Sequence, residues 1–406
     1  MLQDVVFEGL TAPLRLDRAA SVLSLIPDVI PGWSCQVQAA DPAALPFFSI
    51  AATADDGLLS CAWHVENRPT RQFDPVNAVC DAISALAFAL PAEDPRVICL
   101  HAAAVEMAGR LVVFPNIRRA GKSTLSAALA MAGHPLFSDD VLPLSFTTDR
   151  RALGRAMGIA PRLRLPLPDT VPPAFKDWVA EVSGARNRQY LYLSLPEQPK
   201  HGVVRPLGAF VILDRQDDAA DARLERVAPD AAMDVLLHQN FTRDRHSGDI
   251  LHLMAATLAE LPVFRLTYSG LTEAVACLAA GFAEWPDDGP TATLGEELAF
   301  QLARFDGPDL APRSDDDPIR QRMGTIAEEI GNTLYLADPE GLAIHRMDAL
   351  ASVIWSVLED PVTPQDILDL LLEAFPETDA AKVVTDVQAL LAMLHGARLI
   401  ETVARA

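Results

Sequence analysis

The sequence predicts an α/β protein, with a small α+β region before its core and a separate unit after it. From about residue 95 to 285, short apolar runs typical of buried strands alternate with stretches of helical periodicity. Within this core, an apolar strand and a loop lead to Gly121-Lys122-Ser123-Thr124 and then to an alanine-rich helical pattern. That order of elements is typical of a loop that binds nucleotide phosphates. Because 50% of the residues are hydrophobic, large buried cores are feasible.

Charge and cysteine usage narrow the class of protein. The 406-residue chain carries a formal net charge of -22, which disfavours a general nucleic-acid binder because phosphate backbones attract a basic surface. No apolar run reaches the roughly 18 residues of a membrane helix, and the N-terminus, with Asp4 and Glu8, lacks the basic start of a signal peptide. We therefore expect a cytoplasmic protein with neither nucleic acid nor membrane as partner. Its five scattered cysteines suggest buried thiols in a reducing compartment: Cys35, Cys61, Cys80, Cys99 and Cys277.

Residues 1–94 are expected to form the α+β region. Strand-like runs occur at Cys35–Gln38, Phe48–Ala52 and Leu58–His64, and a helical pattern follows from Asp74 to Leu90. Residues 95–285 form the predicted core, and residues 286–317, rich in Asp, Pro and Gly, form a linker. The core strands are expected at Val97–Leu100, Leu111–Phe114, Val141–Ser145, Phe210–Leu213 and Phe264–Tyr268, with helices over Ser123–Ala132 and Leu271–Phe282.

The phosphate-loop interpretation gives each residue a task. Loop amides point at the phosphates, Lys122 reaches the terminal ones, and the hydroxyl of Ser123 ligates Mg²⁺. The pattern G-x-x-x-x-G-K-[ST] has its first glycine where this chain has Asn116, a residue that tolerates left-handed backbone. The alternative is a glycine-containing basic turn, whose arginines pair with the acidic protein surface. The expected nucleotide-binding residues are Asn116, Arg118, Arg119, Ala120, Gly121, Lys122, Ser123 and Thr124.

Acidic residues and a histidine complete the candidate site. Ser138-Asp139-Asp140 directly precedes the Val141 strand, and adjacent carboxylates at a strand edge can hold Mg²⁺ and accept a proton from a substrate hydroxyl. The alternative is an acidic turn, which is common in a chain with 55 acidic residues. His101 closes the Val97 strand. A lone histidine is more often structural than catalytic, but the position between two predicted core strands keeps His101 a candidate.

These motifs together carry a resemblance. His101-Ala102-Ala103-Ala104-Val105, the Leu111 strand, Ala120–Leu125 and Ser138–Asp140 occur in this order and resemble the catalytic domain of HPr kinase/phosphorylase and its relatives, over about residues 94–282. The resemblance implies a P-loop core and transfer of a phosphoryl group from ATP to a serine hydroxyl. It also implies that Asp139 and Asp140 supply the base and a metal ligand, and that His101 matches the family's histidine.

The chain also departs from the family's pattern. Asn116 replaces the family's glycine, which leaves open whether nucleotide binding is followed by turnover. Pro161–Leu165 resembles an arginine-bearing segment of related kinases, whose arginines contact phosphate or substrate; a plain surface strand is the alternative. The glycine-rich segment tied to the phosphorolytic reaction has no clear counterpart, so kinase activity is expected.

Residues 318–406 are predicted to form a compact unit. A strand is expected at Thr333–Leu336, a helix over Met347–Leu358, a helix from Pro364 capped by Thr363, and a final helix over Val383–Leu394. From about Met323 to Glu401 this unit resembles the PqqD family through the Leu334 strand, His345-Arg346-Met347-Asp348 and the apolar positions of its helices. The resemblance implies a winged-helix-like module that binds leader peptides, and such a module can take a peptide as an added strand. An oligomerisation or purely structural appendage is the alternative.

Together these features predict an ATP- and Mg²⁺-dependent kinase acting on a serine hydroxyl. Its expected partner is a peptide or protein, such as a ribosomally made precursor peptide, recruited by the C-terminal module. Two alternatives stay open: a non-catalytic ATP-binding scaffold that recognises peptides, and a kinase of small molecules such as serine. The oligomeric state also stays open, with a homo-oligomer implied by the related kinases.

Overall fold

The computed structural model describes residues 1–54, 57–115, 120–286, 295–305 and 317–403. Its contacts divide the chain into two compact units. The first comprises Met1–Thr242 and Leu261–Ala299, and the second comprises Arg243–Glu260 and Phe300–Ala406. The sequence-based division at residues 94, 285 and 317 stays a prediction. The structural units are drawn differently, because residues 243–260 group with the C-terminal part of the chain.

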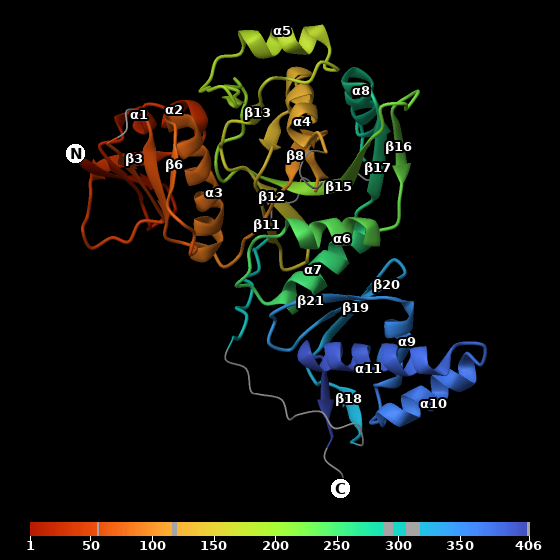
Figure 1. The fold of residues 1–406 in the computed structure, drawn as a ribbon. Coiled ribbons are helices and arrows are strands. Elements are labelled where there is room, and N and C mark those ends of the chain that lie inside the picture. Colours follow the sequence, from red (N-terminus) through yellow and green to blue (C-terminus); the bar gives the residue numbers. More distant parts are fainter. Residues whose placement is uncertain (55–56, 116–119, 287–294, 306–316, 404–406) are drawn as a thin grey trace. The chain divides into compact units, whose positions relative to one another are not determined.

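The N-terminal part of the first unit is a six-stranded sheet packed against one long helix, α3 (Figure 1). The strand order is β3-β1-β2-β4-β5-β6, in which β2 and β4 run parallel. This confirms the strands predicted near Cys35, Phe48 and Leu58. The elements are β1 (Leu2–Phe7), β2 (Leu14–Asp17), α1 (Ala20–Leu23), α2 (Ile26–Val29), β3 (Cys35–Ala39), β4 (Phe48–Ala52), β5 (Leu59–Trp63) and β6 (Arg71–Phe73).

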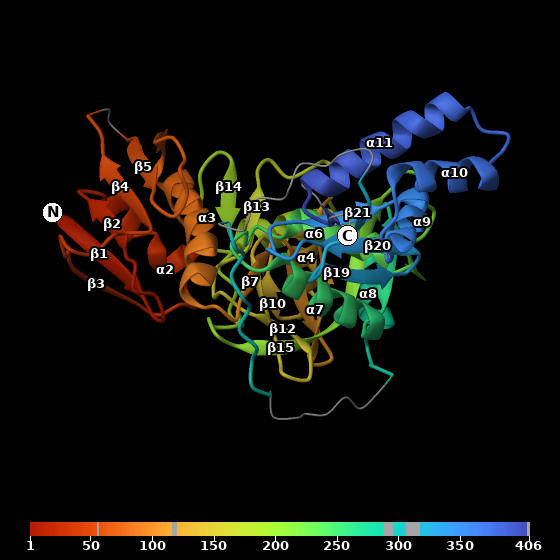
Figure 2. The same cartoon turned by 90° about the horizontal axis from the view of Figure 1, so that it is seen from below.

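Helix α3 (Pro75–Glu93) begins where the sequence predicts. The Asp74 side chain accepts the N–H groups of Val76 and Asn77, and Pro75 occupies the first turn, so the helix start is well capped. Contrary to the expectation from apolar runs, α3 is long and apolar enough to cross a membrane, but 61% of its apolar stretch is buried inside the protein. It packs against β4, β5 and β6 on one side and also contacts β7 of the next sheet (Figure 2), as a core helix does.

The second sheet of this unit has nine strands and forms the predicted α/β core. The strand order is β10-β8-β9-β15-β12-β11-β7, with β17 paired to β15 and β16 paired to β17. Because β9, β15 and β17 run parallel, their carboxyl ends meet at one edge. The strands are β7 (Ile98–Leu100), β8 (Ala103–Met107), β9 (Arg110–Phe114), β10 (Leu136–Ser138), β11 (Leu142–Phe146), β12 (Ala152–Arg155), β15 (Val204–Arg215), β16 (Arg223–Arg226) and β17 (Val263–Tyr268).

Helices follow two of the parallel strands. Helix α4 (Lys122–Met131) comes after β9, α8 (Leu271–Gly281) comes after β17, and the two lie side by side against the sheet (Figure 1). Gly133, at φ +92°, ends α4 as predicted. The other face of α4 packs against α5 (Pro173–Glu181) and the hairpin of β13 (Arg162–Arg164) and β14 (Tyr190–Tyr192). Helix α6 (Asp230–Gln239) leads to a short segment that pairs with β7.

The second unit contains the predicted C-terminal elements and one helix that the sequence did not assign to it. Helix α7 (Ser247–Glu260) packs on the three-stranded sheet β19-β20-β21. Thr363 and Asp366 form a reciprocal capping box at the start of α10, which confirms the predicted cap. The other elements are β18 (Ile319–Gln321), β19 (Ile326–Ile330), β20 (Thr333–Ala337), β21 (Ile344–Met347), α9 (Ala349–Val357), α10 (Pro364–Ala374), α11 (Ala380–Gly396) and β22 (Ile400–Thr402).

Candidate functional site

Two connecting segments, one between β7 and β8 and one between β10 and β11, place the predicted acidic residues beside the histidine. His101 lies between β7 and β8, and Asp139-Asp140 lie between β10 and β11. Since β7 pairs with β11 and β8 pairs with β10, the two connecting segments run next to each other. The Ser138 hydroxyl donates a hydrogen bond of 2.9 Å to the carbonyl of Ala102 and ties them together. The structure therefore brings His101 next to an aspartate pair that is distant from it in the sequence.

Both oxygens of the Asp140 carboxylate are engaged. Nε2 of His101 lies 2.6 Å from Oδ1 of Asp140, and a guanidinium nitrogen of Arg162 donates to Oδ2 at 3.2 Å. Burial opposes ionisation of Asp140, but the hydrogen bond from His101 and the charge of Arg162 outweigh it. The positive charge of Lys122 acts in the same direction, so the pKa of Asp140 falls to about 2. This carboxylate is thus ionised at neutral pH.

Asp139 differs sharply from its neighbour. Its side chain is only 8% exposed, and its Oδ2 accepts the main-chain N–H of Arg162 at 2.8 Å. Burial and the adjacent negative charge of Asp140 raise the pKa of Asp139 to about 7. Two adjacent carboxyl groups therefore have opposite pKa shifts, which is the pattern expected where one acts as a charged ligand and the other exchanges a proton.

The start of α4 supplies the basic residue of the site. Gly121 lies in the left-handed region at φ +89° directly before the helix, and a Cβ there would come within 2.9 Å of the Tyr268 hydroxyl. Lys122, the first helical residue, is buried and contributes to the field at Asp140. Ala120, Ser123 and Thr124 are partly buried around this helix start. The predicted residues Asn116, Arg118 and Arg119 lie outside the described residues.

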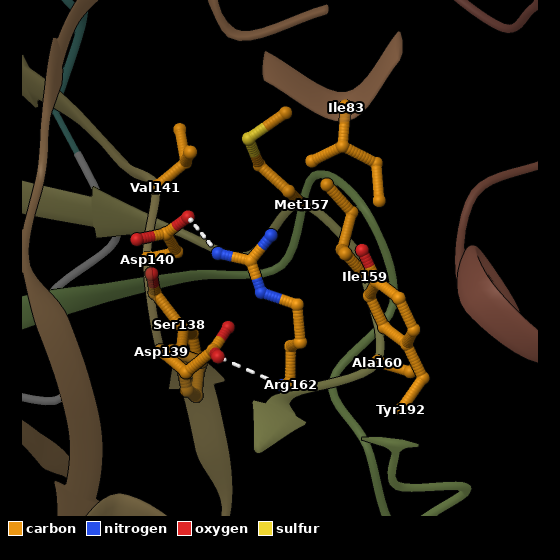
Figure 3. Close-up of a pocket in the computed structure, with 11 residues that line it drawn as sticks. Ile83, Ser138, Asp139, Asp140, Val141, Met157, Ile159, Ala160, Arg162 and Tyr192 are labelled. Atoms are coloured by element: carbon orange, nitrogen blue, oxygen red, sulfur yellow. Dashed lines mark hydrogen bonds and ion pairs between the residues drawn. The ribbon is translucent and has the colours of Figure 1, made fainter. Parts of the chain in front are cut away.

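Arg162 is the site residue that the sequence only partly revealed. The Pro161–Leu165 segment predicts either arginines at a phosphate or a plain surface strand. In the structure, the main-chain N–H of Arg162 binds Asp139 and its side chain binds Asp140 (Figure 3), whereas Arg164 on the same short strand is exposed. A small cavity opens beside these groups, lined by Ser138, Asp139, Asp140, Arg162 and apolar side chains such as Met157. The space that water can occupy there is about 20 Å³, enough for about one water molecule.

The oxygen ligands present fit a magnesium ion better than a transition metal. Within the described part of the chain, no group of three or more His, Cys, Asp or Glu side chains is arranged to hold a metal by itself. Mg²⁺ does not need such a group of side chains. It is usually held by one or two carboxylates, and waters and substrate phosphates complete its coordination shell. The carboxylate of Asp140 and the hydroxyl of Ser123 match that requirement.

Comparison with known proteins identifies part of the second unit. Residues 334–400 match the family model of coenzyme PQQ synthesis protein D (PqqD). The chain carries a PqqD-like domain. This confirms the resemblance drawn from the Leu334 strand and the C-terminal helices. The PqqD-like domain contains β20, β21 and helices α9, α10 and α11.

A solved structure matches part of the chain. It is the Hpr(Ser) kinase/phosphatase from Coxiella burnetii, which is 13% identical, with a match that covers 45% of this chain and 95% of that chain at a TM-score of 0.24. The kinase named by the sequence resemblance thus also occurs among the structural matches, but a superposition this poor transfers neither fold nor activity. No curated protein matches the chain.

Proposed function

We propose that this protein is an ATP-dependent kinase that phosphorylates a serine-like hydroxyl on a peptide or protein captured by its PqqD-like domain. One observation carries the proposal: Asp139 and Asp140 have opposite pKa shifts, and Asp140 contacts His101 and lies within the electrostatic field of Lys122 at the start of α4. Phosphoryl transfer needs a proton acceptor, a metal ligand and a cation for the phosphates. The site offers a residue for each role.

The roles follow from the charges. Lys122 stabilises the transferred phosphoryl group, and Ser123 with Asp140 would hold Mg²⁺, which supplies charge neutralisation when bound. The substrate oxygen forms a bond to the γ-phosphorus, the bond to the β,γ-bridging oxygen breaks, and ADP leaves. The carboxylate of Asp139 accepts the hydroxyl proton, a step suited to a group whose pKa is near 7. The water-sized space beside Asp139 would admit a hydroxyl oxygen.

The PqqD-like domain supports a peptide as the phosphate acceptor. Strand β21 is at the end of the strand order β19-β20-β21, and an extended chain can add to a sheet as a further strand at such a position. Capture by a domain on the same chain raises the local concentration of the peptide near the site. A kinase of free serine would not need this domain.

The test is a transfer assay on the full chain. The protein is incubated with Mg²⁺, γ-labelled ATP and either a library of serine- and threonine-containing peptides or free serine, beside Lys122→Ala and Asp139→Asn variants. We expect labelled peptide from the wild type and a loss of about 10²–10³-fold in each variant. Equal labelling of free serine would indicate a small-molecule kinase. Nucleotide binding with no transfer to any acceptor would replace the kinase with an ATP-binding scaffold.

A further inference from the structure

Arg162 contacts both aspartates, and its own place is fixed by the N-terminal region. We propose that Arg162 is a positioning residue of the transfer site and that residues 1–94 are part of this site because they hold Arg162 in place. The inference rests on the proposed kinase function and adds a role for the region whose function the sequence leaves open.

Arg162 sets the relative orientation of the two carboxyl groups. Its main-chain N–H binds Oδ2 of Asp139 at 2.8 Å, while its guanidinium binds Oδ2 of Asp140 at 3.2 Å (Figure 3). His101 takes the remaining oxygen of Asp140. One residue therefore fixes Asp139 through its backbone and Asp140 through its side chain. A shift of Arg162 would move both groups at once.

The guanidinium is held by Cys80 of the N-terminal region and by Tyr190 on β14, the strand paired with β13. It donates an N–H to the sulfur of Cys80 on α3, and it lies over the ring of Tyr190 with 4.7 Å between the guanidinium carbon and the ring centroid. Ile83, one turn further along α3, lines the cavity under the aspartates. Only 21% of the Arg162 side chain is exposed, so these partners set its direction. Helix α3 thus contributes directly to the surroundings of the carboxyl pair.

The backbone that leads to Arg162 is clamped by the same region. The amide of Ala160 donates to the carbonyl of Val29, and the amide of Gly32 donates to the carbonyl of Gly158, each at 2.9 Å. The two glycines approach so closely that a Cβ on Gly32 would lie 2.7 Å from the Cα of Gly158. Gly158 also has φ +68°, which other residues adopt only with strain. Any side chain at Gly32 would therefore push on the segment that carries Arg162.

A purely stabilising ion pair is the competing explanation, and the two make different kinetic predictions. If Arg162 only stabilises the fold, a substitution reduces the amount of folded protein, and binding stoichiometry and turnover fall together. If Arg162 positions the aspartates, folded protein binds Mg-ATP with unchanged stoichiometry and affinity but turns it over slowly, because a misplacement near 1 Å costs about 100-fold in rate.

Arg162→Lys is the first variant, because it keeps the charge and loses the planar fork. Transfer of label from γ-labelled ATP, with Mg²⁺, to the peptides that the wild-type full chain labels gives kcat and KM, and equilibrium titration with Mg-ATP gives the binding stoichiometry. We expect kcat to fall about 100-fold with KM within about twofold of wild type. Arg164→Lys, on the same strand but exposed, is the matched control and should leave both constants unchanged.

Gly32→Ala tests the clamp from outside the site. We expect a smaller fall in kcat, about 10-fold, again without loss of binding stoichiometry. Gly396→Ala is its control, since a Cβ there meets no atom within 4 Å.

The positioning role of Arg162 is overturned if Arg162→Lys keeps the wild-type kcat, or if its binding stoichiometry falls together with kcat. The part assigned to residues 1–94 is overturned if Gly32→Ala keeps the wild-type kcat. A wild-type protein that transfers no label from ATP to any acceptor overturns the kinase proposal itself, and the positioning role with it.

Discussion

Nε2 of His101 and Oδ1 of Asp140 lie 2.6 Å apart and join the segment between β7 and β8 to the segment between β10 and β11, beside the hydrogen bond from Ser138 to Ala102. His101 reaches this position because its own amide is tied to the carbonyl of Gln239 at 2.8 Å, on the segment that pairs with β7. The imidazole therefore meets the carboxylate from a fixed backbone. Asp140 is oriented by this contact, while Asp139 is oriented by Arg162.

His101→Ala is expected to lower turnover of Mg-ATP by about 10- to 100-fold, because a hydrogen bond to a charged group contributes about 1.5–3 kcal/mol and orients Asp140. His101→Gln keeps an N–H donor on a side chain of similar reach and should recover part of the rate. Steady-state kinetics on both variants measures the difference. Equal losses in the two variants would contradict a role through this hydrogen bond.

The rate of transfer is expected to rise with pH and then level off. The proposed proton acceptor, Asp139, works only when ionised, and its pKa is raised to about 7. Turnover should therefore increase about tenfold per pH unit below pH 7 and flatten above it. A pH profile of kcat at saturating Mg-ATP checks this expectation. A rate that is flat between pH 5 and 8 would show that Asp139 is not the base.

Asp139 should also make the fold less stable as pH rises. The pKa of Asp139 is about 7 in the folded chain against 3.8 for an ordinary aspartate, so between these values the folded state holds a proton that the unfolded state has lost. The free energy of unfolding should accordingly fall by about 3 kcal/mol from this group between pH 5 and 8, at about 1.36 kcal/mol per unit up to pH 7. Urea unfolding without Mg²⁺, compared with Asp139→Asn, isolates the effect. The variant should lack this part of the slope, and parallel curves for the two proteins would contradict it.

The sequence predicts those parts of the fold that depend on local patterns. The strand at Leu111–Phe114, the helix beginning near Lys122 and the capped helix after Thr363 all depend on near neighbours in the chain, and the structure confirms them. Helix α7 shows the limit. No helix over residues 247–260 is predicted from the sequence, and its packing on β19 depends on strands that lie far along the chain.

The same limit applies to the site. Asp139, Asp140 and His101 could be named because each stands beside a recognisable strand. The opposite pKa shifts of the two aspartates could not be predicted, because they depend on burial and on Arg162. Arg162 lies 22 residues after Asp140 in the sequence. Cys80 could not be linked to the site either, since its contact with Arg162 requires the packing of α3 against the core.

Gly121 gives a test of the helix start that is independent of the aspartates. Alanine at position 121 lowers the free energy of unfolding by about 1–2 kcal/mol because φ +89° strains a residue with a Cβ. That Cβ would also lie 2.9 Å from the Tyr268 hydroxyl. Gly202→Ala is a matched control, because Gly202 has φ +83° but no atom within 4 Å of a Cβ. Thermal unfolding should show a larger loss for Gly121→Ala than for Gly202→Ala, and only the former should weaken binding of Mg-ATP. Adding Tyr268→Phe to Gly121→Ala should recover the excess loss and leave the backbone strain, because it removes the oxygen and nothing else. If the two glycine variants behave alike, the close approach of Tyr268 does not shape this helix start.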